Sequence, residues 1–320
     1  MTLFHYNFDR PLNLFNMSAY KVIAKVFVGC CLSSFIMEIL MARSPNSANF
    51  ITFLQFFFIT VQGILNMKSK ILVPKIPLKQ YFVLISLFFI TSFANNYVYA
   101  LHVPSTLHMI IRSASSPASM LVSWYARQRR PKTNSIIGSI LVFIGVTLAM
   151  YGGAKVVDET KGKFVFWCIG VTILLSTLIT GAYTGLQQEV LYAKYGKHPE
   201  EMLFYTHALP LPLFFGIYPE LKNTAVKLQF DIWAIIVINI ISQFYCAHSV
   251  HKLATTEPSV TVTFILTLRK FVSLLLSAVV FKNNLTILHV LGTVFVVVGT
   301  YYYFDFFSNR QQRPVSMKDK

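Results

Sequence analysis

The sequence predicts an all-α polytopic membrane protein with about ten transmembrane helices in two inverted five-helix repeats. Composition is the first observation, since 55% of the 320 residues are hydrophobic and only 12% are charged. A soluble domain carries roughly twice that charged share. So few charges cannot coat a soluble globule of this length, and we expect lipid to face much of the surface. The other two observations are the lengths of the apolar segments and an internal repeat.

Ten apolar segments approach the roughly 17–25 residues that a helix needs to cross the hydrocarbon core. They cover residues 20–41, 49–66, 81–101, 104–125, 134–152, 164–187, 202–218, 230–250, 258–281 and 286–307. The segment 202–218 is the weakest, because it is short and contains Pro210 and Pro212. The first apolar run leads directly into further spans, so we expect an uncleaved signal anchor there.

The basic residues between the segments favour one side of the membrane. With both termini in the cytosol, cytosolic segments hold 16 Lys and Arg residues and the opposite side holds 7. Cytoplasmic loops carry such an excess, so the bias predicts an even number of spans and two cytosolic termini. The basic residues form short clusters rather than one stripe, so the net charge of +16 does not indicate nucleic-acid binding.

An internal repeat relates the two halves of the chain. A shift of 154 residues maps the fourth and fifth segments onto the ninth and tenth, placing Pro104-Ser105 on Pro258-Ser259, Gly138 on Gly292 and Gly145 on Gly299. Because each repeat has five spans, the halves must enter the membrane in opposite directions. We therefore expect repeats at 1–153 and 154–320 within one transmembrane domain. Inverted repeats are typical of secondary transporters, whose substrate site lies at the repeat interface near the midplane.

Arg269 and Lys270 lie near the middle of the ninth segment, where an ionisable residue is costly and marks a functional site by default. Adjacent helical positions diverge by about 100°, so both can face one cavity only if it is wide. A phosphate would match their charge, since Arg supplies forked donors and Lys a point charge. The alternative is that both reach the membrane interface, which is difficult from this depth.

Four further charged residues lie within or at the ends of spans. Lys25 could reach the interface, whereas Glu38 could balance a basic site residue when substrate is absent. Arg112 could hold a helix interface or add positive charge to a cavity. Glu189 is either an interfacial charge or a cavity residue.

A recognition wall of polar and aromatic residues is predicted in the third and sixth segments. Amides could read a base or sugar hydroxyls, and a tyrosine ring could stack on a base. The alternative is hydrogen bonding between helices. The residues are Asn95, Asn96, Tyr97, Tyr99, Tyr183 and Gln187.

The cysteines and histidines predict no metal site. Cys30, Cys31, Cys168 and Cys246 lie in apolar segments without CxxC spacing, so neither a zinc site nor a disulfide framework is indicated. We expect four small buried hydrophobic residues. His248 and His251 could share a metal, but the sequence offers no third ligand, and we expect no cofactor.

Motifs for catalysis are absent from the sequence. It has no Gly-rich phosphate loop, no HExxH, no GxSxG and no paired acidic motif of a metal-dependent glycosyltransferase. We therefore do not expect an enzyme, although a membrane-embedded glycosyltransferase and a scaffold for Golgi enzymes remain alternatives.

Several strings spread over most of the chain resemble one family. They are Gly29-Cys30-Cys31, Phe50 through Phe56, Asn95-Asn96-Tyr97, Gly181 through Gln188, Lys194 through His198, His207 through Pro212, and Leu268-Arg269-Lys270-Phe271. The chain resembles the nucleotide-sugar transporters of the drug/metabolite transporter superfamily. Within them it is similar to the subgroup that carries UDP-N-acetylglucosamine and UDP-xylose, on the strings Tyr-Gly-Lys-His and His-Ala-Leu-Pro-Leu-Pro. The Arg-Lys pair is shared more widely and supports only the class.

The resemblance implies alternating access and exchange of luminal UMP for cytosolic UDP-sugar across a Golgi or endoplasmic reticulum membrane. It also implies that Lys270, with Arg269 beside it, contacts the phosphates. The expected partners are therefore UDP-sugar, UMP and membrane lipid, and a homodimer is left open. A transporter of the same fold for another nucleotide-sugar or a phosphorylated metabolite remains the alternative.

Overall fold

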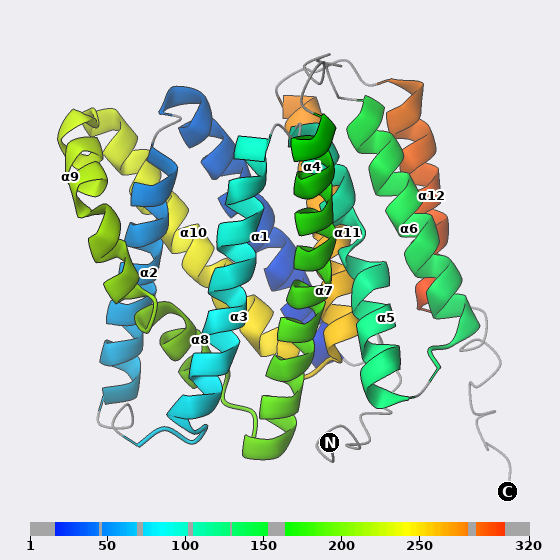
Figure 1. Cartoon of the computed structure of the whole chain (residues 1–320), viewed down its shortest axis with the longest axis horizontal. Coiled ribbons are helices and arrows are strands. Elements are labelled where there is room, and N and C mark those ends of the chain that lie inside the picture. The colour runs from blue at the N-terminus through cyan, green and yellow to red at the C-terminus, as the bar shows by residue number, and fades with distance from the viewer. Residues whose placement is uncertain are drawn as a thin grey trace, which may run out of the picture.

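The computed structural model describes residues 17–44, 47–68, 73–101, 105–128, 130–152, 164–280 and 286–304, and the regular elements in these ranges are all helices (Figure 1). The α-helices are α1 (Met17–Arg43), α2 (Ala48–Met67), α3 (Leu78–Tyr97), α4 (Ser105–Ser113), α5 (Ser115–Arg127), α6 (Thr133–Gly152), α7 (Phe164–Tyr195), α8 (Pro199–Ala208), α9 (Tyr218–Lys227), α10 (Phe230–Ala254), α11 (Ser259–Val280) and α12 (Ile287–Tyr303). Two 3₁₀ helices, η3 (Val98–Leu101) and η4 (Leu211–Ile217), follow α3 and α8.

Six helices in the described ranges are long and apolar enough to cross a membrane, which confirms an all-helical multi-pass protein. They contain Tyr20–Arg43, Ala48–Met67, Thr133–Tyr151, Cys168–Tyr195, Phe230–Ala254 and Ser259–Leu276. Leu78–Thr91 and Ile287–Tyr303 are shorter apolar helices. The count of ten spans and the inverted repeat remain predictions.

The fourth predicted segment is interrupted where one helix was expected. Ala114 separates α4 from α5. Pro117 lies three residues later and has no N–H to bond the carbonyl of Ser113, and its ring crowds that carbonyl. The helix must therefore end before Pro117 and restart with this proline in its first turn.

The seventh predicted segment is broken more severely. Residues 202–218 are divided among α8, η4 and the start of α9. Pro210 precedes η4 and Pro212 lies in its first turn, where the missing N–H costs no helical hydrogen bond. Of the ten predicted segments, this is the one that departs furthest from a single helix.

One end of the bundle carries most of the basic residues that the structure describes. We call it the basic end, and it is the lower end in Figure 1, where α5, α7 and α10 finish. Its members are Lys68, Lys75, Lys79, Arg127, Arg130, Lys132, Lys194, Lys197 and Lys252. The opposite end carries Arg43, Lys222 and Lys227. This asymmetry follows the predicted charge bias, and the assignment of the basic end to the cytosol remains a prediction.

Two pairs of glycines allow α6 and α12 to pack closely. A Cβ atom on Gly138 would lie 2.5 Å from the carbonyl oxygen of Gly299, and one on Gly145 would lie 2.6 Å from that of Gly292. The pairs run in opposite directions along the two helices. The shift of 154 residues exchanges the two pairs, so this contact is self-complementary in the manner of a two-fold interface.

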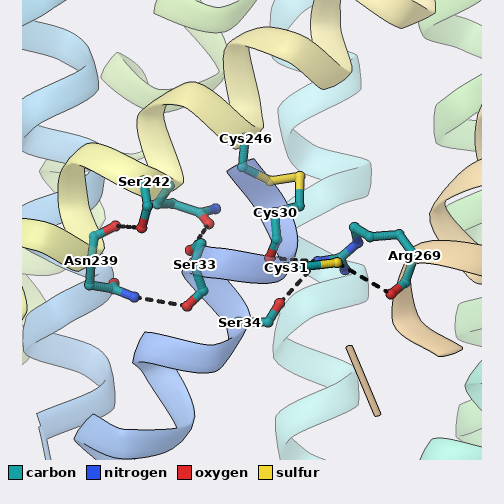
Figure 2. Close-up of a disulfide and its surroundings, with 9 residues drawn as sticks. Cys30, Cys31, Ser33, Ser34, Asn239, Ser242, Cys246 and Arg269 are labelled. Carbon is teal, nitrogen blue, oxygen red and sulfur yellow. Dashed lines mark hydrogen bonds between the residues drawn. A yellow bond between two sulfur atoms is a disulfide. The ribbon is translucent and has the colours of Figure 1, made fainter. Parts of the chain in front are cut away.

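A disulfide joins α1 to α10, and the expectation that all four cysteines are unpaired is wrong for two of them (Figure 2). Cys30 and Cys246 are bonded, with their Cα atoms 4.6 Å apart. The two helices approach closely here because Gly29 has no side chain, and a Cβ atom on Gly29 would lie 3.2 Å from the backbone nitrogen of Cys246. Cys31 and Cys168 are free, Cys31 buried and Cys168 partly buried.

Replacing Gly145 by valine should lower the melting temperature of the detergent-purified protein. The side chain would collide with the backbone of α12, and overpacking of this kind costs about 1–3 kcal/mol. Gly181→Val is the matched control, because a Cβ atom on Gly181 meets nothing within 4 Å. Equal melting temperatures for the two variants would contradict the close packing of α6 and α12.

The disulfide can be tested by labelling the denatured wild-type protein with a thiol-reactive reagent. We expect two labelled cysteines without reductant, Cys31 and Cys168, and four after reduction. The double variant Cys30→Ser/Cys246→Ser should show two under both conditions. Four labels on unreduced wild-type protein would contradict the bond.

Candidate functional site

A cavity of about 490 Å³ lies between helices from both halves of the chain. Its walls come from α3, α4, α7, α10 and α11. The lining residues are Phe88, Thr91, Arg112, Gly181, Thr184, Gly185, Gln188, Glu189, Val250, Ala254, Ser259, Val262, Thr263 and Leu266. An apolar lining with a few converging polar groups is typical of a small-molecule site.

The interruption at Ala114 places irregular backbone beside this cavity. Arg112 lines the cavity from the last turn of α4. Directly after the interruption, the hydroxyls of Ser115 and Thr267 are 3.3 Å apart, which joins the start of α5 to α11. Interrupted helices near the midplane are typical of the substrate sites of transporters.

Lys270 continues the face of α11 that lines the cavity. Ser259, Thr263 and Leu266 line it at intervals of four and three residues, and Lys270 follows four residues later on the same face. Arg112 is close enough to Lys270 for the two charges to interact. Arg112, in the cavity wall, and Lys270, on α11, therefore lie near one another, and they come from different halves of the chain.

Arg269 has a different environment from its neighbour, and Figure 2 shows it against α1. Its Nη1 donates to the carbonyl oxygen of Cys30 at 3.2 Å and to Oγ of Ser34 at 3.0 Å. In return, Sγ of Cys31 lies 3.8 Å from the carbonyl oxygen of Arg269. The guanidinium thus ties α11 to α1 next to the disulfide, which is the helix-interface role that backbone carbonyls give a buried arginine.

A buried carboxylate closes the cavity towards the basic end. Oε2 of Glu189 lies 2.6 Å from Nη2 of Arg127, and it accepts a hydrogen bond from the backbone N–H of Ser259 at 2.8 Å. Ser259 is the first residue of α11, where a negative charge is favourable. Glu189 is 6% exposed and the Arg127 side chain 21%. One side chain on α7 therefore holds the ends of α5 and α11.

Gln188, beside Glu189, connects the cavity wall to a histidine on α10. Its Nε2 lies 3.0 Å from Nδ1 of His251, and the hydroxyl of Tyr192 lies 3.4 Å from the same nitrogen. Among the described residues, no group of three or more His, Cys, Asp and Glu side chains could hold a metal. His251 here serves as a hydrogen-bond partner of Gln188.

Two more carboxylates lie buried at the basic end. Glu201 accepts hydrogen bonds from the backbone N–H groups of Lys75 and Ile76 and from the hydroxyl of Tyr81 at 3.0–3.1 Å, fixing the connection before α3. Glu257 lies between α10 and α11. Burial raises the pKa of Glu257 to about 7, against the opposing effect of Lys197. Because the ordinary pKa of this carboxyl is 4.5, burial of Glu257 costs stability progressively as the pH rises from about 4.5 to about 7, and the full cost remains above that.

The structure distributes the other predicted site residues over several places. Tyr183 lines a separate groove on the outside of α7. Gln187 is partly buried and does not line the cavity. Tyr97 is 51% exposed at the end of α3. Lys25 and Glu38 are both exposed on α1. The side chains of Asn95, Asn96 and Tyr99 lie outside the described part of the structure.

Sequence reasoning missed two polar residues that shape the site, Gln188 and Arg127. Gln188 was passed over in favour of Gln187, because α7 is apolar around most of its circumference and its sequence does not show which side faces inward. Arg127 is one of the 16 basic residues assigned to cytosolic segments, and its pairing with a carboxylate was not predicted. A signal was available, since Arg127 and Glu189 are oppositely charged residues at the ends of segments predicted to finish on the same side.

The helical bundle, its apolar exterior and a cavity between its two halves define a multi-pass membrane protein with an internal small-molecule cavity. The UAA transporter family model matches residues 18–306, and the chain belongs to this family of nucleotide-sugar transporters. It is a transporter rather than an enzyme.

Three curated relatives have names that refer to nucleotide-sugar transport. The chain is 37% identical to "Nucleotide sugar transporter SLC35B4" of Pongo abelii, covering 89% of this chain and 93% of the relative. It is 36% identical to "Endoplasmic reticulum GDP-fucose transporter" of Drosophila melanogaster, covering 89% and 90%. It is 34% identical to "UDP-xylose and UDP-N-acetylglucosamine transporter" of Danio rerio, covering 92% and 96%. A crystal structure with 12% identity matches 92% of this chain and 99% of its own at a TM-score of 0.65, which shows the fold alone.

Glu189→Gln should lower the melting temperature markedly, because it removes the charge that pairs with Arg127 and faces the start of α11. A hydrogen bond to a charged group contributes about 1.5–3 kcal/mol. Asp231→Asn is the matched control, since Asp231 pairs with Arg43 at 3.5 Å with both side chains more than half exposed and such pairs contribute about 0–1 kcal/mol. A loss no greater for Glu189→Gln than for Asp231→Asn would contradict the structural role of Glu189.

Proposed function

We propose that the protein exchanges UDP-N-acetylglucosamine, UDP-xylose or both for UMP across a Golgi or endoplasmic reticulum membrane. The observation that carries the proposal is the cavity between the two halves, with Arg112 in its wall and Lys270 on the same face of α11 as its lining. The named substrates of the Danio rerio relative favour these two sugars. In this proposal the diphosphate binds near the two cations, and the rest of the ligand extends along the polar wall.

Exchange follows from the charges in the cavity. An empty carrier would have to change conformation with the positive charges of Lys270 and Arg112 close together in a largely apolar bundle and no bound phosphate beside them, which is unfavourable. A UDP-sugar and UMP each bring a phosphate that neutralises these cations. The carrier can therefore change between its two access states more readily with either ligand bound than when it is empty. Uptake of one ligand then requires release of the other.

Alternating access requires the basic end to open and close. In this proposal the contacts of Glu189 with Arg127 and Ser259 form when that end is closed and break when it opens. Arg269 and the disulfide keep α1, α10 and α11 together during the movement. The crossed pairing of the glycines on α6 and α12 supports two inverted halves, whose relative motion would provide the two access states.

A second candidate substrate is GDP-fucose, which the name of the Drosophila melanogaster relative gives for that protein. The same cations would bind its diphosphate, so the charges do not discriminate between the two nucleotides. Competition does. Uptake of UDP-N-acetylglucosamine into proteoliposomes preloaded with UMP should be inhibited by UDP-xylose and not by GDP-fucose, and the reverse preference would favour the second candidate.

Lys270→Ala should reduce the uptake of UDP-N-acetylglucosamine into UMP-loaded proteoliposomes about tenfold to a hundredfold. This is the equivalent of one charge-assisted hydrogen bond. The melting temperature should not change much. Arg269→Ala should instead lower the melting temperature, since its guanidinium connects two helices. Lys222→Ala on α9 is the control, and it should transport as the wild type does. Normal exchange by a folded Lys270→Ala variant would contradict the proposed phosphate site.

A further inference from the structure

A second hollow lies on the outside of the bundle, separate from the cavity. Its volume is about 900 Å³, and it is lined by residues of α3, α5 and α7. Figure 1 shows these three helices on the near face, and α7 packs against both of the others. We call it the α3–α5–α7 groove. Its large side chains are exposed, with Leu121 at 62%, Tyr125 at 83% and Ile179 at 60%.

We propose that the α3–α5–α7 groove binds one anionic phospholipid, with an acyl chain along the apolar wall and the charged headgroup at the basic end. The groove lies on the outer surface of a bundle that crosses a membrane, so its apolar wall faces the bilayer. Leu87, Leu121, Val122 and Ile179 provide that wall. The proposal does not depend on which substrate is transported.

The length of the groove matches one leaflet. Its lining on α5 runs from Ala118 to Gln128, which is about 15 Å along a helix axis. The hydrocarbon core is about 30 Å thick, so the groove extends over roughly half of it. The polar end coincides with the end of α5, where the chain leaves the membrane. Tyr125, one turn before that end, is of the residue type enriched at the membrane interface.

The charges select an anionic headgroup. Arg127 and Gln128 form the polar end of the groove. Arg130 and Lys132 follow within five residues, and both are exposed. Lys194 is also exposed, and it lies eleven residues after Tyr183 on the same face of α7. Juxtamembrane clusters of this kind attract anionic lipids.

The lipid would also contact the pair that closes the cavity. Arg127 uses Nη2 for Glu189, and a guanidinium has further N–H donors for a second anion. A headgroup phosphate at the end of the groove would therefore share Arg127 with Glu189. Because Arg127 is shared, a bound lipid would change the strength of the contact between Arg127 and Glu189 at the basic end.

The test uses the delipidated full-length protein and compares dioleoylphosphatidylserine with dioleoylphosphatidylcholine, which differ in net charge but not in acyl chains. The measurements are lipid retention by native mass spectrometry and the change in melting temperature. We expect preferential binding of phosphatidylserine. Arg130→Gln/Lys132→Gln should weaken it by about 25-fold, since each basic residue near an anionic headgroup contributes roughly fivefold. Ala118→Trp, which fills the groove, should also remove the preference.

Lys222→Gln/Lys227→Gln is the control, because it removes the same charge from exposed positions of α9 at the opposite end. It should retain the preference, and soluble glycerophosphoserine should have no effect on the melting temperature. The proposal is overturned if wild type binds the two lipids equally. It is also overturned if the α9 variant loses as much preference as Arg130→Gln/Lys132→Gln, or if Ala118→Trp binds phosphatidylserine as wild type does.

Discussion

Ionised side chains within an apolar bundle need partners, and the contacts of Arg269 show how this protein supplies them. The Arg269 guanidinium donates to a backbone carbonyl and a hydroxyl on α1, one turn of α1 that also carries the disulfide to α10. In the next turn of α1, the carbonyl oxygen of Ser33 accepts a hydrogen bond from Asn239 of α10 at 3.0 Å. Gln55 of α2 donates in turn to Asn239 at 2.7 Å. These hydrogen bonds and the disulfide connect α11, α10 and α2 to α1 or to one another, so α1, α2, α10 and α11 form one unit.

This arrangement separates two adjacent basic residues by function. A helix turns by about 100° per residue, so Arg269 can face α1 while Lys270 continues the face of α11 that lines the cavity. The hydrogen bonds of Arg269 hold α11 in this rotation. In the proposed function, the hydrogen bonds of Arg269 fix the rotation of α11, and Lys270 binds the anion as it arrives and departs.

The lengths of apolar runs and the net bias of charges were enough to predict an all-helical membrane protein and the bounds of most helices. They could not predict the bond between Cys30 and Cys246, because 216 residues separate them and only the packing at Gly29 brings them together. The division at Ala114 was within reach, since Pro117 excludes the bond that would continue the helix. The rotation of a helix about its own axis was the main property that the sequence could not predict. Tyr183 lines the outer groove and Gln188 the cavity, a distinction that depends on how α7 packs.

The proposed exchange depends on a phosphate binding close to both Arg112 and Lys270. The most direct measurement is an experimental structure of the full-length protein with UDP-N-acetylglucosamine bound. We predict that the diphosphate lies within hydrogen-bond distance of Lys270 and contacts Arg112, while Arg269 keeps its bonds to Cys30 and Ser34. A nucleotide-sugar bound elsewhere, or with its phosphates held by Arg269 in place of the contacts to α1, would contradict the account.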